Sequence, residues 1–391
     1  MILYDSSAIS KHPDYGIMIP VKPDKGIKVL EFLGGTFPVL DFVAAKALLK
    51  IDGHFFSRED LERIHCKKYI AKLYGNELKT ELLKNYELID VQGNFNRYEP
   101  EKAIKPLEDM FQTLFTKASG TYLACLLARE ASLHKARETT LQNVRETTFS
   151  DKNNFNVGFC YYLGGGMHHA RYDAPSGFCL INDITAAAFK LLAEKSIQLI
   201  WIIDLDAHKG DGTAELVSFA RDRGELCIPQ TDPLFHKSSD NISNNYFIKE
   251  KPCILTLSIH MAKGWPLDNE SLALAETGRA PLIPSDVDIG IDSGEEAEYT
   301  ARLASGIRKL ENLSGRNPDF VLVEDGADPY EHDSLPSASL MRLTLEQCVE
   351  RDIWLYRYLQ EHSIPSAWVQ GGGYGERAWE PSAHFLRSIQ S

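Results

Sequence analysis

The chain has 391 residues, of which 43% are hydrophobic and 25% charged, and its formal net charge is −13. This balance is typical of a soluble folded protein, and so much negative charge argues against nucleic acid as the main partner while leaving room for cationic substrates. The opening MILYDSSAIS lacks a basic segment followed by an apolar stretch, and no apolar run approaches the roughly 18 residues of a bilayer span. We therefore expect no cleaved signal, no membrane span and a cytoplasmic location.

The seven cysteines are odd in number, widely scattered and never in a CxxC pair; they stand at positions 66, 125, 160, 179, 227, 253 and 348. This pattern favours reduced core thiols over a disulfide framework. No Pro-rich or Ser-rich linker, repeat or low-complexity tract divides the chain, so we predict a single domain over residues 1–391.

Helical patterns alternate with short, nearly all-apolar runs, which predicts an α/β fold with a mainly parallel sheet. The lysine-rich stretch 67–84 is expected to be a solvated helix face. Three further helices are expected: 183–195 after the cap Asn182 or Asp183, 295–313 ending at Gly315, and 344–362 opened by the capping box Thr344–Gln347.

Five apolar runs are predicted strands, and each ends in a polar or glycine-rich cluster: 157–163, 199–203, 253–257, 320–323 and 367–369. If these strands are parallel neighbours, all five clusters meet at the carboxyl edge of one sheet, where open α/β folds place their sites.

Asp204, Asp206 and His208 alternate at the end of one run, so a period of two sends their side chains to the same side. Alone, this triplet could be a solvated strand exit. Carboxylates that directly follow the buried LIWII need a partner or a cation, and Asp328 follows another buried run. Two carboxylates and one imidazole suit a catalytic Zn²⁺ with an open position, while Fe²⁺, Co²⁺ and Mn²⁺ remain admissible.

The pair His168-His169 follows the three glycines 164–166 at the end of another predicted strand. Both imidazoles can face a metal-bound water, and Asp204 and Asp211 are available to orient them. Tyr374 follows the glycines 371–373, and its phenol can donate a hydrogen bond to a developing oxyanion.

These motifs, in order GGGMHHA, SGFCLIND, DLDAHKGDGT, GAD and GGGY, resemble those of the zinc-dependent histone deacetylases and their bacterial amidohydrolase relatives, nearest to the class IV-like branch. The resemblance implies an arginase-like three-layer α/β/α fold. It also implies that Asp206, His208 and Asp328 bind one zinc ion. His168 and His169 would lie beside the attacking water, held by Asp204 and Asp211, and Tyr374 would polarise the scissile carbonyl.

The same resemblance implies a narrow tunnel for an acylated lysine side chain. Gly177 and Phe178 would line it opposite Trp265, with Leu335 at the gatekeeper position. It further implies a structural potassium site built around Asp204, Asp206, His208 and Ser258. The chain departs from many relatives in having Lys209 for a second histidine, Met167 for an aromatic residue and Trp265 for Phe.

The sequence thus predicts a zinc-dependent hydrolase that removes acetyl or longer acyl groups from N-ε-acyl-lysine in proteins or peptides, because Leu335 offers no carboxylate for a second substrate cation. One alternative is an acetylpolyamine amidohydrolase of the same family. A second is a two-manganese ureohydrolase, although Gly210 stands where that site needs a ligand. A third is a non-catalytic acyl-lysine reader.

Overall fold

The computed structural model describes residues 1–51, 56–90, 92–142, 158–194, 196–229, 251–268 and 282–390. Its strands form one eight-stranded sheet in the order β2-β1-β3-β8-β7-β4-β5-β6, and every neighbouring pair is parallel. The strands are β1 (Ile2–Leu3), β2 (Val39–Leu40), β3 (Phe159–Tyr162), β4 (Leu199–Asp204), β5 (Cys253–Met261), β6 (Val287–Ile291), β7 (Phe320–Glu324) and β8 (Ser366–Val369).

The five strands predicted from sequence are the five adjacent strands β3, β8, β7, β4 and β5 at the centre of this sheet. Both faces of β4 are buried: Ile200 and Ile202 pack into one core, whereas Leu199, Trp201 and Ile203 pack into the other. A strand covered on both faces needs apolar residues at every position, which is why these segments read as continuous apolar runs. Position 157 of the first predicted strand lies outside the described residues.

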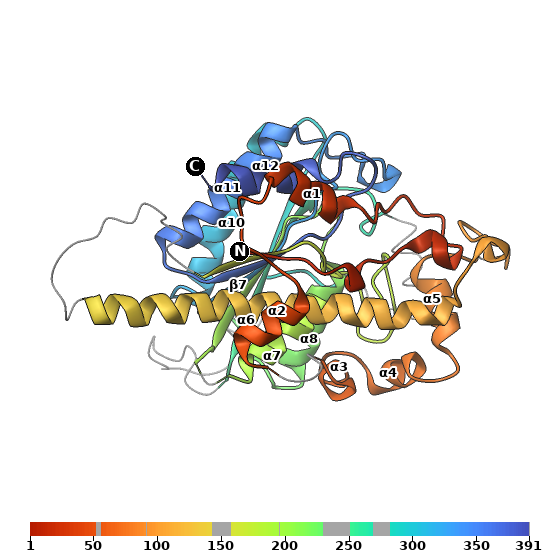
Figure 1. The fold of residues 1–391 in the computed structure, drawn as a ribbon, viewed down its shortest axis with the longest axis horizontal. Coiled ribbons are helices and arrows are strands. Elements are labelled where there is room, and N and C mark those ends of the chain that lie inside the picture. Colours follow the sequence, from red (N-terminus) through yellow and green to blue (C-terminus); the bar gives the residue numbers. More distant parts are fainter. Residues whose placement is uncertain are drawn as a thin grey trace, which may run out of the picture.

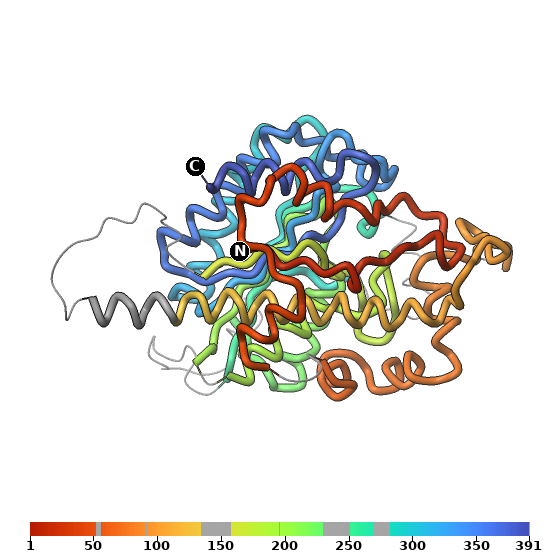
Figure 2. The backbone as a smooth tube through the Cα atoms, in the orientation of Figure 1, coloured from red at the N-terminus to blue at the C-terminus, as the bar shows by residue number. Residues whose placement is uncertain are grey.

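Helices cover both faces of the sheet, so the predicted three-layer α/β/α fold is confirmed (Figure 1). One layer contains α2 (Phe42–Leu49), α6 (Met110–Gln142), α7 (Asp183–Leu192) and α8 (Asp211–Asp222), with α3 (Arg58–Ile64), α4 (Lys67–Leu73) and α5 (Leu78–Asn85) beside it. The other contains α1 (Lys25–Leu33), α10 (Tyr299–Ser314), α11 (Leu345–Glu361) and α12 (Glu380–Ser388). In this second layer the first and last helices, α1 and α12, lie side by side (Figure 2).

The helix ends follow the predicted capping residues. Asn182 Oδ1 accepts the backbone N–H of Thr185 at 2.8 Å, and Thr344 and Gln347 form a reciprocal capping box at the start of α11. Helix α10 ends at Gly315, whose φ of 64° is a left-handed conformation that glycine adopts at little cost. Helix α7 ends at Leu192, earlier than predicted, and position 195 is not described.

The lysine-rich stretch 67–84 is helical, as predicted, and Lys67, Lys68, Lys79 and Lys84 are exposed on it. The structure breaks it into α4 and α5, and Glu81 is buried between the two ammonium groups of Lys72 and Lys84, at 3.3 and 3.0 Å. The positive charge there partly serves to neutralise an internal carboxylate, which charge spacing alone could not indicate.

The expectation of reduced cysteines fails for one pair, because Cys227 and Cys253 form a disulfide. Cys253 begins β5, and the backbone N–H of Cys227 donates to the carbonyl of Pro252, which brings the two Cα atoms to 5.1 Å. This contact is tertiary and has no spacing signature. The other five cysteines are free thiols. No helix in the described part of the chain combines the length and apolarity needed to cross a membrane. The single-domain assignment stays a prediction.

Candidate active site

The predicted site residues follow four neighbouring strands at the carboxyl edge of the sheet. Strand β4 ends at Asp204 and runs into Asp206 and His208; β3 leads to the histidine pair, β7 to Asp328 and β8 to Tyr374. The parallel order β3-β8-β7-β4 therefore places four segments, far apart in sequence, around one point.

Asp206, His208 and Asp328 form a buried cluster. His208 Nδ1 lies 2.9 Å from Asp328 Oδ2 and 3.1 Å from Asp206 Oδ1, and each residue is less than 5% exposed. Burial lowers the pKa of His208, but the two carboxylates outweigh it and raise that pKa to about 10. Burial and the neighbouring Asp206 raise the pKa of Asp328. A cation among these groups would offset both the desolvation and the repulsion of the two carboxylates.

Two glycines make room for this cluster. A Cβ on Gly372 would lie 2.1 Å from Asp206 Oδ2 and 2.8 Å from Asp328 Cγ, and one on Gly326 would lie 2.4 Å from Asp206 Oδ2. Any side chain at either position would displace the carboxylates. The buried donor set of two carboxylates and an imidazole, in this glycine cradle, fits a divalent metal ion.

The two histidines are each held by a carboxylate. His168 Nδ1 donates to Asp204 Oδ2 at 2.6 Å and His169 Nδ1 donates to Asp211 Oδ1 at 2.7 Å, while the two rings lie 3.8 Å apart. These bonds hold a proton on each Nδ1 and fix the orientation of both rings.

The two imidazoles have opposite proton affinities. Burial and the charge of His168 lower the pKa of His169 to about 4. Burial also lowers the pKa of His168, but Asp204 and Asp206 outweigh it and hold that pKa above its ordinary value. At neutral pH, His169 is therefore the neutral member of the pair.

Tyr374 lies at the edge of the cluster. Its backbone N–H donates to Asp333 Oδ2 at 2.6 Å, and its ring packs edge-on against Phe178 with centroids 6.2 Å apart. Burial, followed by the charge of Asp328, raises the pKa of its hydroxyl well above the usual value, so the phenol remains a hydrogen-bond donor.

All four predicted tunnel residues line one cavity of about 260 Å³: Gly177, Phe178, Trp265 and Leu335, together with His169, His208 and Tyr374. The Trp265 ring centroid lies 4.5 Å from that of His169. A Cβ on Gly177 would lie 2.5 Å from both rings, and its φ of 52° is left-handed, so glycine is required there. Phe178 shares this backbone conformation (φ 64°) and stacks on Tyr86.

The predicted potassium residues lie close together, since Ser258 in β5 is the cross-strand partner of Asp204 in β4. Ser258 Oγ accepts the backbone N–H of Gly210 at 3.3 Å and lies 3.0 Å from His260 Nδ1. Lys209, which replaces the second histidine of many relatives, directly follows His208. It is buried and pairs with Asp288, so its ammonium is held in place. The potassium ion itself stays a prediction.

Two buried groups at the site escaped sequence analysis. Glu324 ends β7 and lies in a cluster with His168 and Asp204; its Oε2 accepts the N–H of Gly326, while its Oε1 has no hydrogen-bond partner among the described residues. A carboxylate closing a buried strand is the signal that singled out Asp204, and it could have found Glu324 as well. Lys25 donates to the carbonyls of Gly371 and Gly372 at 2.9 and 3.1 Å, a contact across 346 positions with no local signal.

Arg351 of α11 joins the two segments that carry the cluster. Its fully buried guanidinium donates to the carbonyl of Leu205 at 2.8 Å and to that of Gly326 at 2.7 Å. It also neutralises the buried carboxylates of Asp325 and Asp352. The guanidinium therefore sets the spacing of Asp206 and Asp328, although it touches neither.

We expect Arg351→Met to weaken zinc binding about 10–100-fold and to lower the free energy of unfolding by about 3–5 kcal/mol, because two buried carboxylates lose their partner. Competition with a chromogenic chelator on folded protein measures the first effect, and urea denaturation the second. Arg308→Met, at an exposed position of α10, is the control and should change neither. Unchanged zinc affinity in a folded Arg351→Met protein would contradict the positioning role.

Comparison with known proteins agrees with this geometry. The model of the histone deacetylase domain matches residues 20–387. The chain belongs to the histone deacetylase domain family. Histone deacetylase clr6 of Schizosaccharomyces pombe is 24% identical over 96% of this chain and 72% of its own. An uncharacterized protein of Picosynechococcus sp. is 26% identical over 56% of this chain and 57% of its own, and histone deacetylase 8 of Xenopus tropicalis is 24% identical over 54% and 46%.

The latter two alignments span about half the length of those family members. Among solved structures, acetylpolyamine aminohydrolase from Burkholderia pseudomallei superposes with a TM-score of 0.57 at 17% identity, covering 99% of this chain and 98% of its own. At that identity the likeness concerns the fold.

Proposed function

We propose that this family member is a zinc-dependent amidohydrolase that removes acyl groups from N-ε-acyl-lysine. One observation carries the proposal: a buried Asp-His-Asp cluster lies beside two aspartate-backed histidines, and His208, His169 and Tyr374 also line the cavity of about 260 Å³. This combination supplies what amide hydrolysis needs, namely an electrophile, a base and an oxyanion donor.

Asp206, His208 and Asp328 would hold the metal. Zn²⁺ in such a site acts as a Lewis acid that lowers the pKa of a water molecule to about 7 and polarises a carbonyl. The glycines at 326 and 372 and the guanidinium of Arg351 keep the three side chains in place for it.

His169 is the proposed general base. It is neutral at pH 7, its Nδ1–H is held by Asp211, and its Nε2 can accept the proton of the attacking water and return it to the leaving amine. His168, protonated and held by Asp204, stabilises negative charge beside it. The Tyr374 hydroxyl donates to the oxygen that becomes negative in the tetrahedral intermediate.

The tunnel walls favour an acylated lysine over an acetylated polyamine. Leu335 lines the tunnel as an apolar side chain. The carboxylate of Glu87 also lines it, but Arg97 lies 3.6 Å away as its ion-pair partner, so a second substrate cation would meet a neutralised pair. The polyamine reading remains the second candidate, because the structural neighbour from B. pseudomallei is named for that activity.

A zinc-loaded activity panel tests the proposal. We expect hydrolysis of acetyl-lysine peptides with a kcat/KM at least about tenfold above that on acetylspermidine or acetylputrescine. The reverse order would favour the polyamine reading. Urea release with two manganese ions per chain would favour a ureohydrolase, and binding of acetyl-lysine peptides without turnover would favour a reader.

A further inference from the structure

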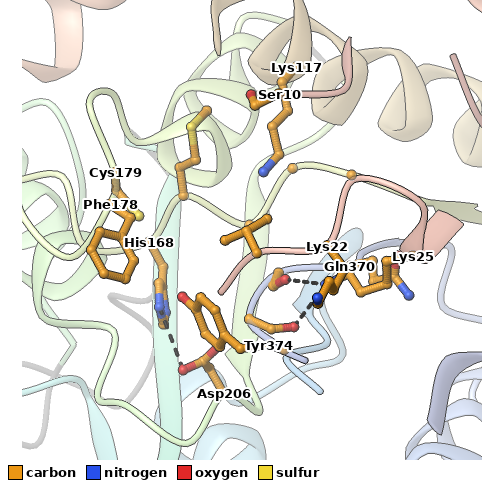
Figure 3. Close-up of a pocket in the computed structure, with 18 of the residues that line it drawn as sticks. Ser10, Lys22, Lys25, Lys117, His168, Phe178, Cys179, Asp206, Gln370 and Tyr374 are labelled. Atoms are coloured by element: carbon orange, nitrogen blue, oxygen red, sulfur yellow. Dashed lines mark hydrogen bonds and ion pairs between the residues drawn. The ribbon is translucent and has the colours of Figure 1, made fainter. Parts of the chain in front are cut away.

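A second cavity, of about 140 Å³, is lined by His168, Asp206 and Tyr374 of the site and by Ser10, Lys25 and Lys117 (Figure 3). It shares His169, His208 and Tyr374 with the tunnel, so the two hollows meet at the proposed point of reaction. Gly177 and Phe178 also line both cavities, and the rest of the wall comes from Cys179, the N-terminal segment, α1, α6 and the segments that contain the two glycine loops. The acyl group of a substrate whose carbonyl lies at the cluster would extend into this cavity.

The wall of this cavity carries polar groups without partners. Lys117 extends from α6 past Ser10 toward the hollow, and its ammonium makes no hydrogen bond or ion pair with any described residue (Figure 3). Ser10 Oγ and His12 Nδ1 are buried, at 9% and 6% residue exposure, and likewise lack a hydrogen-bond partner in the described part of the chain. A buried donor without an acceptor costs stability unless a ligand provides one.

The positive charge of Lys117 acts on the titratable groups around it: burial raises the pKa of Asp183, and Lys117 partly counters this without forming an ion pair with it. Burial and then the charge of Lys117 lower the pKa of His12 to about 3 and that of Lys25 to about 8. Lys25 already donates to two carbonyls of the glycine loop, so its charge has no dedicated carboxylate there. An anion beside Lys117 would satisfy its ammonium and the Ser10 hydroxyl together.

The residues that line the cavity indicate what kind of anion it could bind. Leu163, Met167 and Val21 line the same cavity, so its wall also provides apolar surface for methylene groups. An anion attached to the acyl group by a short methylene chain uses both surfaces. Acetyl, by contrast, has no group that reaches the ammonium.

We propose that this cavity binds the distal carboxylate of a dicarboxylic acyl group, so that succinyl-lysine and glutaryl-lysine are preferred substrates. The inference rests on the proposed function and adds a substrate class to it. In the reaction, water adds to the amide carbonyl and the C–N bond breaks; the lysine amine leaves with a proton from water, and the dicarboxylate product carries a new carboxylate besides the distal one.

The test compares kcat/KM of the zinc-loaded full chain on succinyl-lysine and succinamoyl-lysine peptides, which differ only in having a distal carboxylate or its neutral primary amide. We expect a preference of about tenfold or more for succinyl, as a charge-assisted hydrogen bond gives. Lys117→Met should reduce the ratio to about one while the rate on acetyl-lysine stays within threefold. Lys79→Met, on exposed α5 surface, is the matched control and should keep the preference.

Calorimetry with glutarate gives a readout independent of turnover. The wild-type chain should bind glutarate at least about tenfold more tightly than Lys117→Met does. Hydrolysis of acetyl-lysine with no preference for succinyl over succinamoyl would overturn this inference and leave the proposed function intact. The inference would also be overturned if Lys117→Met changed inhibition by acetate but not the preference for succinyl. The cavity would then bind the acetate product and not a distal carboxylate. Glutarate binding without hydrolysis of any acyl-lysine would support the site and refute the proposed function.

Discussion

Tyr374→Phe is expected to lower kcat/KM on an acetyl-lysine peptide by about 10²–10³-fold, the usual effect of removing one oxyanion donor. The substitution removes only the hydroxyl. The ring keeps its contact with Phe178 and the backbone keeps its hydrogen bond to Asp333, so the side chain should stay in place. Because Tyr374 is not among the metal-binding groups, zinc content should remain at about one ion per chain.

Steady-state kinetics with parallel elemental analysis measures both quantities. Tyr86→Phe is the matched control: its buried hydroxyl takes no part in the proposed mechanism and belongs to a ring that stacks on Phe178. That variant should stay within a few-fold of wild type. Wild-type turnover by Tyr374→Phe would remove the oxyanion role from the proposed mechanism.

Asp328→Asn is expected to weaken zinc binding by more than about 100-fold, beyond the loss typical of removing a group that only supports a ligand. Hydrolysis should be lost with the metal. In the metal-free chain, however, the substitution relieves a repulsion, because Asp206 and burial raise the pKa of Asp328. The metal-free variant should therefore be at least as stable as the metal-free wild type.

Thermal denaturation with and without zinc separates these effects. Zinc at 100 times its Kd stabilises a folded protein by about 2.7 kcal/mol, so the wild-type Tm should rise and that of Asp328→Asn should not. Asp292→Asn is the control, because Asp292 also follows a strand of the sheet, β6, but pairs with the exposed Lys263. A zinc-dependent rise in Tm that survives in Asp328→Asn would mean that the ion binds elsewhere.

Much of the fold was predictable because the relevant signals are local. A strand buried on both faces must be apolar throughout, so β4 and β7 could be identified, together with Asp204 at the end of β4 and Asp328 shortly after β7. The caps at Thr344 and Gly315 depend on backbone groups within a few residues. The convergence of Asp206, His208 and Asp328 then follows from the rule that parallel strands share a carboxyl edge; the roles of these residues stay predictions.

The amino-acid sequence alone indicated the five central strands, the helix caps at Asn182, Gly315 and Thr344, and most of the chemical groups at the strand ends. The tertiary structure decided which distant groups meet: the Cys227–Cys253 disulfide, the burial of Glu81, the reach of Arg351 to two ligand loops, and the gathering of Ser10, His12 and Lys117 around one cavity. The physical reason is that capping and alternation depend on neighbours along the chain. Whether a buried charge has a partner depends on the side chains that tertiary packing brings within a few ångströms of it.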